Sequence, residues 1–170
     1  MRFMVVVPIA VVVLCSGCPE PEAEPEAEPA ADCSAQTPSD TSTLPERELV
    51  LGEVVDGTFT PWAEGEQVTA VYGFQGAPMI TPWFQIPATT GDEDGACWHL
   101  TYEHLDAEGE VSEEHGAYSG GLVFTLVGEV MRTGPLFDIT YADAGSTERL
   151  RVTVSTPEFV AIEELSITVN

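Results

Sequence analysis

The chain contains no lysine, and its basic residues other than histidine are five arginines. Without a lysine amine, neither Schiff-base catalysis nor the lysine isopeptide cross-links of some surface adhesins is available. Acidic residues number 29, so the formal net charge is −24 at pH 7. A body with this charge is repelled by phosphate backbones and by anionic lipid head groups. The composition therefore excludes nucleic acid as a partner. It also means that any attachment to a membrane must come from something other than charge attraction.

Long apolar segments are also missing, except for residues 4–14, which follow Arg2. This run suits the core of a signal peptide and is too short to span a bilayer as a helix. The sequence "LCSG" then leads to Cys18, and small residues directly before a cysteine resemble the lipobox of bacterial lipoproteins. The resemblance implies removal of residues 1–17, lipidation of Cys18 and a place in the bacterial cell envelope, at the outer membrane. A redox CxxC motif would need a folded strand-to-helix context, which this leader lacks.

The segment from Cys18 to residue 45 is dominated by Pro, Glu, Ala, Asp, Ser and Thr. This segment has too few large apolar side chains to offset the entropy lost on ordering. Its composition therefore predicts that it is a disordered acidic tether. Fully extended, such a tether would reach up to ~80 Å at about 3 Å per residue. The folded domain is then expected over residues 46–170.

Two cysteines remain after the leader, Cys33 and Cys97. An even number of cysteines in an oxidising compartment predicts a disulfide, although two free thiols stay possible because Cys33 lies in the tether. A loop this long contributes roughly 4 kcal/mol by the chain-entropy model.

From residue 46 onward, apolar residues recur mainly with a period of two, which is typical of half-buried strands. Turn sequences such as "DGT", "DAEGE" and "RTGP" separate the segments, and no amphipathic helix is evident. The pattern predicts an antiparallel immunoglobulin- or fibronectin-like β-sandwich of seven to nine short strands. The expected strands cover residues 48–55, 67–74, 79–87, 98–105, 110–115, 122–131, 136–141, 149–155 and 165–169.

About forty residues carry a second resemblance, in "LVLGEVVDGTFTPWAEGEQVTAVYGFQGAPMITPWFQI". This stretch resembles the start of the domain in predicted acidic-tethered lipoproteins of myxobacteria and their relatives. The matching residues are Gly52, Phe59, Pro61, Gly65, Val68, Gly73, Gln75 and Gly76. The resemblance implies an immunoglobulin-like sandwich of unassigned function and implies no activity. Where that family continues with a glycine and a histidine, this chain has Ala77, Pro78 and Met79, so a role for that histidine does not carry over.

Catalytic patterns are weak throughout the chain. Ser119 lies among glycines in "GAYSGG", but the spacing of a nucleophile elbow is absent, and no other nucleophile is paired with a base. Asp92 and Asp94 in "GDEDG" offer oxygen ligands for Ca²⁺ without the rest of a calcium-loop pattern. We therefore expect no enzyme activity and no cofactor.

The best metal candidate is the predicted hairpin around "DAEG". A type I turn with Gly109 in the left-handed conformation would pair Asp106 with Glu110 and set the register of the strands. That register places Glu103 opposite Glu113, and two facing carboxylates repel each other unless a cation lies between them. With the neighbouring histidines, the candidate ligands are His99, Glu103, Glu113 and His115. Exposed strand residues that bind nothing are the alternative interpretation.

Trp83 is the best candidate for ligand binding. Ile80, Phe84 and Ile86 share one phase of their strand, which places Thr81, Trp83 and Gln85 on the opposite face. A tryptophan flanked by hydrogen-bonding side chains can hold a sugar ring or an aromatic residue of a protein partner. The alternative is that Trp83 is covered by a loop or lies in a core closed on both sides.

These expectations combine into a lipid-anchored envelope protein that displays a binding module on a tether, with a glycan or protein partner. A divalent-metal-binding envelope protein and a structural component without a ligand are the alternatives.

Overall fold

The computed structural model describes residues 33, 35, 40–73, 76–113, 115, 117–139 and 144–170. The chain divides into two units after Ala30, and the described residues all belong to the second, Ala31–Asn170. That unit begins before residue 46, where the sequence placed the domain boundary. The expected signal peptide, Cys18 and the tether up to residue 32 lie outside the described residues. No helix in the described part of the chain is long and apolar enough to cross a membrane.

The fold is all-β, as the sequence predicted, and its strands form one large sheet and one small sheet. The strands of the large sheet are β1 (Glu46–Arg47), β2 (Val50–Val55), β3 (Thr58–Pro61), β4 (Glu66–Val68), β7 (Trp83–Pro87), β8 (Ala96–Leu105), β9 (Tyr118–Val127), β10 (Val130–Thr133), β12 (Thr147–Ser155) and β13 (Val160–Val169). The small sheet contains β5 (Val71–Tyr72), β6 (Pro78–Ile80) and β11 (Asp138–Ile139). The thirteen described strands outnumber the seven to nine expected, because the structure also contains five strands of only two or three residues.

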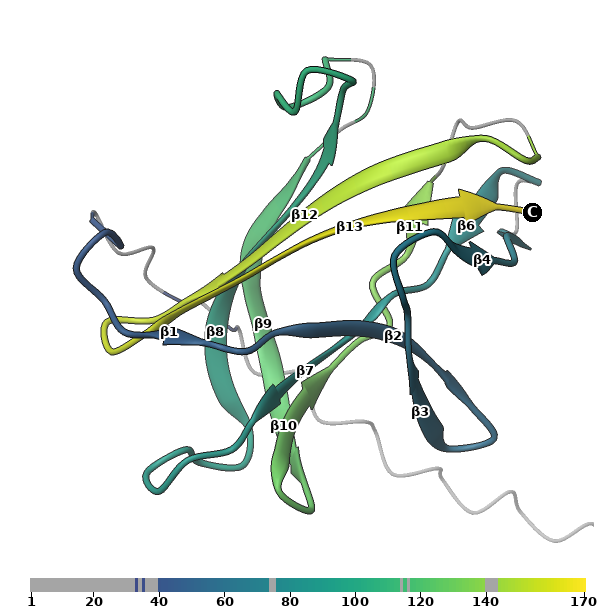
Figure 1. Ribbon diagram of the computed structural model, residues 1–170. Helices are drawn as coiled ribbons and strands as arrows, with labels where there is room; N and C mark the ends of the chain where they lie inside the picture. Colours follow the sequence, from purple (N-terminus) through teal and green to yellow (C-terminus); the bar gives the residue numbers. More distant parts are fainter. Residues whose placement is uncertain are drawn as a thin grey trace, which may run out of the picture. The chain divides into compact units, whose positions relative to one another are not determined.

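The large sheet runs in the order β1-β13-β12-β8-β9-β10-β7-β2-β3, and β4 pairs with β13 (Figure 1). Strand β9 connects the two halves of this sheet. Its residues from Tyr118 to Phe124 pair with β8, whereas Thr125 to Val127 pair with β10. The halves on either side of β9 supply the two faces of a sandwich-like core.

The core confirms most of the predicted strand phases. Ile80, Phe84 and Ile86 are fully buried, and Phe84 meets Tyr102 of β8 edge to face, with ring centroids 6.3 Å apart. The alternating apolar residues of β8, β12 and β13 are buried in the same cluster: Trp98, Leu100, Tyr102, Leu150, Val152, Val154, Leu165, Ile167 and Val169. Burial of alternate side chains from both halves is what holds the two faces together.

Several strand predictions were wrong in their extent or phase. Residues 79–87 form two strands, β6 in the small sheet and β7 in the large sheet, separated by Thr81 and Pro82. Residues 122–131 are not one strand, because Gly128 has a φ of 65° and turns the chain back from β9 into β10. The described residues among 110–115 form no strand beyond an isolated bridge between Leu105 and Val111. The alternation read over residues 67–74 breaks between β4 and β5, which leaves Tyr72 76% exposed.

Candidate functional site

Trp83 lies in a shallow hollow on the outer side of the sheet. Along β7, Phe84 and Ile86 are buried in the core, and Trp83 and Gln85, on the opposite face, are half-buried. The Trp83 indole packs closely on the chain at Gly134, where a Cβ atom would lie 3.1 Å from its Cδ2. The face predicted for Trp83 and Gln85 therefore agrees with the structure, whereas Thr81 lies between β6 and β7 and does not line the hollow.

Arg132 of β10 lies beside this tryptophan and was missed by the sequence analysis. Its neighbours in register are Gln85 on β7 and Thr125 on β9. Its guanidinium lies 5.4 Å from the ring centre of Phe59, whose ring packs over Gly52. With the Gln85 amide turned so that its oxygen faces Arg132, that oxygen accepts hydrogen bonds from Nε, at 2.8 Å, and from Nη2. Arg132 is thus held by a cation–π contact and by two of its five N–H donors.

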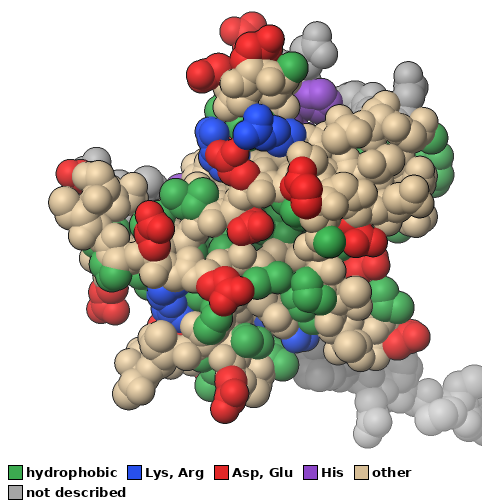
Figure 2. Space-filling view, in the orientation of Figure 1, with side chains coloured by type: hydrophobic (Ala, Val, Ile, Leu, Met, Phe, Trp, Pro, Cys, Tyr) green, Lys and Arg blue, Asp and Glu red, His purple; other side chains and the backbone are tan. Residues whose placement is uncertain are grey.

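The hollow has a volume of about 320 Å³ and contains no acidic side chain in its lining. Its walls come from three adjacent strands and the chain after β10: Trp83, Val123, Thr125, Val127, Arg132, Thr133 and Gly134. Two other hollows in the described residues are lined by carboxylates, one by Asp92, Glu93 and Glu158 and the other by Glu64 and Glu164. Figure 2 shows how acidic side chains are scattered over one face of the molecule, with few basic ones among them.

The four residues predicted as a metal site do not come together. The turn itself forms as expected, with Gly109 at a φ of 86° and the Asp106 N–H donating to the Glu110 carbonyl at 2.8 Å. The predicted pairing of Leu105 with Val111 is also confirmed, but from Tyr102 back to Ala96 β8 pairs with β9. The predicted register therefore does not continue to Glu113 and His115, because apolar side chains that pack on the core resume only at Tyr118.

Each of the four predicted ligands has different surroundings. His99 lies opposite Gly121 and is 6% exposed, and its Nε2 is 3.2 Å from the Ser119 hydroxyl. Glu103 lies opposite Arg151 of β12 and does not face Glu113. His115 stacks on the ring of His104 with centroids 4.8 Å apart. The repulsion that suggested a bound cation is therefore absent.

The candidate calcium ligands Asp92 and Asp94 also bind protein groups. Asp92 forms a salt bridge with Arg47 at 2.8 Å and accepts from the Thr89 N–H at 2.7 Å. Burial would raise the pKa of Asp92, but the hydrogen bonds from Arg47 and Thr89 outweigh it and lower this pKa below 3.8. Asp94 accepts a hydrogen bond from the Leu126 N–H at 2.8 Å. Both carboxylates thus fasten loops.

A buried ionic cluster centres on His104, which the sequence analysis did not single out. Its Nε2 lies 2.9 Å from Asp138 and its Nδ1 lies 2.9 Å from Glu148, so the ring is placed between two carboxylates. The Tyr102 hydroxyl donates to the same Asp138 oxygen at 2.9 Å. The residues of this ionic cluster come from β8, β11 and β12, so the cluster joins strands of the large and the small sheet.

The protonation of His104 follows from this geometry. Burial by itself lowers the pKa of His104, but the hydrogen bonds and charges of Asp138 and Glu148 dominate and raise it from 6.5 to about 9. Burial and the same two acids raise the pKa of Tyr102 well above 10. At neutral pH His104 is therefore an imidazolium, and each of its nitrogens faces a carboxylate.

Within the described residues, His104, Asp138 and Glu148 are also the one group of three or more side chains that could hold a metal ion. Their ligand atoms lie within 4.8 Å of one another. Both ring nitrogens already face carboxylates, however, so a metal ion would have to displace the proton.

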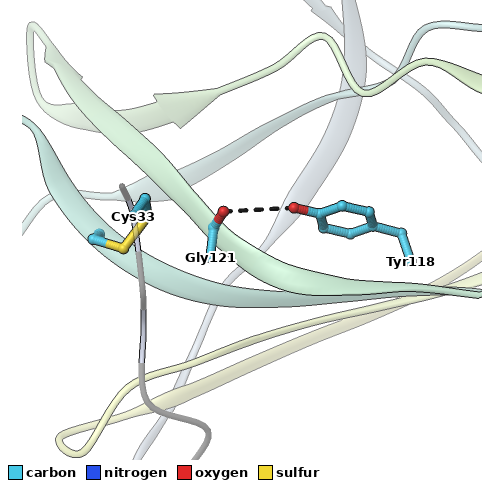
Figure 3. Close-up of a disulfide and its surroundings, with 4 residues drawn as sticks. Cys33, Tyr118 and Gly121 are labelled. Carbon is cyan, nitrogen blue, oxygen red and sulfur yellow. Dashed lines mark hydrogen bonds between the residues drawn. A yellow bond between two sulfur atoms is a disulfide. The ribbon is translucent and has the colours of Figure 1, made fainter. Parts of the chain in front are cut away.

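Cys33 and Cys97 form a disulfide, as predicted, with Cα atoms 5.5 Å apart. The backbone at Cys33 crosses β9 at Gly121 (Figure 3). A Cβ atom at Gly121 would collide with the Cys33 carbonyl oxygen and would lie 3.0 Å from the Ala35 nitrogen. The Tyr118 hydroxyl points to the Gly121 carbonyl at 3.5 Å. The disulfide thus fixes the chain at Cys33 to the middle of the sheet.

No protein-family model matches this chain, and no curated protein or solved structure matches it.

Proposed function

We propose that this protein is a lipid-anchored component of the bacterial cell envelope that displays a β-sandwich binding module at the outer membrane. The single observation that carries the binding role is the Trp83 hollow, whose lining includes both Trp83 and Arg132. Tryptophan and arginine are the side chains most enriched at the energetic centres of binding sites. The membrane contact in this proposal comes from a lipid on Cys18 alone.

The disulfide changes the geometry of the proposed tether. A bridge to Cys97 fixes Cys33 to the domain, so the free segment runs from Cys18 to Cys33 and not to residue 45. Such a segment spans about 45 Å when extended, at roughly 3 Å per residue, compared with ~80 Å for the longer tether. The proposed module is therefore held closer to the membrane surface than the sequence suggested.

The binding role is tested by calorimetry of the full mature chain against a panel of glycans, together with a pull-down from envelope extracts. Trp83→Ala is expected to weaken binding by about 2 kcal/mol or more if Trp83 is the centre of the site. Tyr72→Ala is the matched control, because Tyr72 is an exposed aromatic residue on β5 of the small sheet. If no ligand is captured, a structural component without a ligand becomes the better interpretation, and if both variants bind a captured ligand equally well, the Trp83 hollow is not its binding site.

A further inference from the structure

We propose that the Trp83 hollow binds a sugar that carries a carboxylate, such as a uronic acid unit of an acidic polysaccharide. In this complex Trp83 contacts the face of the sugar ring and Arg132 contacts the carboxylate. The inference rests on the proposed binding function and specifies its ligand class.

The chain as a whole repels polyanions, but the charges around this hollow favour a single carboxylate. Three of the four described arginines have a carboxylate within 4.0 Å, since Arg47 pairs with Asp92 and both Arg149 and Arg151 pair with Glu164. Among the described residues, Arg132 has no such partner. The lining of its hollow is also free of acidic side chains, in a chain with 29 of them. A carboxylate placed there meets one cation and no lining anion.

The orientation of Arg132 fits this role. Its Nε and Nη2 donate to the Gln85 oxygen, and its plane is supported by the Phe59 ring. These contacts leave three N–H donors for a ligand and reduce the entropy lost when one binds. A guanidinium binds a carboxylate through two parallel hydrogen bonds, which a lysine amine cannot do.

The remaining walls suit a sugar ring. Trp83 offers a flat apolar surface for ring C–H groups, and the exposed Thr125 offers a hydroxyl group as a hydrogen-bond partner. The volume of about 320 Å³ is at the lower end of the range for small-molecule pockets, so the hollow takes one or two rings.

The sheet topology disfavours an extended peptide as the ligand. Strands β7 and β10 have a paired strand on each side, and along the edge of β9 beyond Phe124 the Leu126 N–H already donates to the Asp94 carboxylate. A peptide that binds by adding a strand needs a free edge with unpaired backbone groups, which this edge does not offer at Leu126. A ligand on this face must therefore be recognised by side chains.

The test compares oligogalacturonate with its methyl ester, which has the same rings and no carboxylate charge. Calorimetry of the full mature chain should show about 10-fold tighter binding of the acid, the effect of one charged hydrogen-bonded contact. Arg132→Gln should abolish this preference while Trp83→Ala weakens both ligands. Arg149→Gln is the control, because Arg149 is paired with Glu164 and lines a different hollow. Circular dichroism and thermal melts establish that each variant is folded.

Other uronic acids are covered by repeating the comparison with glucuronate, mannuronate and guluronate oligomers. Equal affinity for acids and esters, with loss of both in Trp83→Ala, would overturn the acidic-sugar inference and leave the binding function standing. Binding of no uronate by the wild-type chain would also overturn the inference. If Trp83→Ala left the affinity for every captured ligand unchanged, the Trp83 binding function itself would fail. Tighter binding of oligoglutamate than of any uronate would replace the sugar by an acidic protein partner.

Discussion

The His104 cluster predicts that the protein loses stability in mildly alkaline solution. Because the pKa of His104 rises from 6.5 to about 9 on folding, its proton is bound about 2.5 pH units more tightly in the native state. Each unit corresponds to 1.36 kcal/mol, so the cluster contributes about 3 kcal/mol when His104 is protonated. The imidazole is only 3% exposed but Asp138 is 13% exposed, so about 3 kcal/mol is the upper value of this contribution.

The direction of the pH dependence follows from the sign of the shift. A group whose pKa is raised on folding stabilises the native state fully below its unfolded pKa, and this contribution is lost as pH rises toward the folded pKa. The free energy of unfolding should therefore decline between pH 6.5 and about pH 9. Because the pKa of Tyr102 is well above 10, ionisation of its hydroxyl does not contribute in this window.

The measurement is urea denaturation of wild type and His104→Gln between pH 6 and 10, with EDTA present. At pH 6 we expect the variant to be less stable by about 3 kcal/mol, and this difference should shrink by most of its size by pH 10. His99→Gln is the matched control, since His99 is comparably buried but faces the Ser119 hydroxyl and no carboxylate. A difference between wild type and His104→Gln that stayed constant across this range would refute the reasoning.

Four further outcomes are expected. Replacing both Cys33 and Cys97 by serine should cost about 4 kcal/mol of unfolding free energy in urea, because the bridge closes a loop of 64 residues; unchanged stability would contradict the loop argument. Gly121→Ala should push the Cys33 backbone off β9 and lower the melting temperature, which calorimetry would detect; an unaltered melt would show that the contact is dispensable. Mass spectrometry should find an acylated Cys18 at the mature N-terminus, and Cys18→Ser should release the protein from membranes; an intact Met1 would exclude lipidation. Zn²⁺ should bind no tighter than about 10 µM by calorimetry, as expected of stray ligands, and a tighter site lost in His104→Gln would establish a metal-binding protein.

Much of the fold was predictable because its core strands alternate strictly. In β12, Leu150, Val152 and Val154 are buried while Arg149 is exposed, which a period of two indicates directly. The hairpin of β9 and β10 was missed because the apolar residues continue through "LVGEVM" across the turn. Gly128 was the available signal, since a glycine inside an alternating run marks a turn or a bulge.

The candidate sites were less predictable, because their residues meet through long-range pairing. The face of Trp83 followed from the phase of its own strand, but its neighbour Arg132 comes from a strand whose boundaries were wrong. His104 was hidden because it continues the phase of Trp98, Leu100 and Tyr102, which the sequence assigned to an apolar face. A histidine in such a series indicates a buried polar group that needs partners, and those partners lie 34 and 44 residues further along the chain, at Asp138 and Glu148.

Cations are scarce in this chain, so the position of each one carries information. Arg47 joins β1 to the loop at Asp92, and Arg149 and Arg151 join β12 to β13 through Glu164. The His104 imidazolium is placed between two carboxylates and joins strands of both sheets. Each of these cations offsets acidic charge where segments distant in the sequence meet. Arg132 instead lines an outward hollow without acidic side chains and contacts Gln85 of β7 and Phe59 of β3, so among the described arginines it is the one on which the proposed carboxylate contact depends.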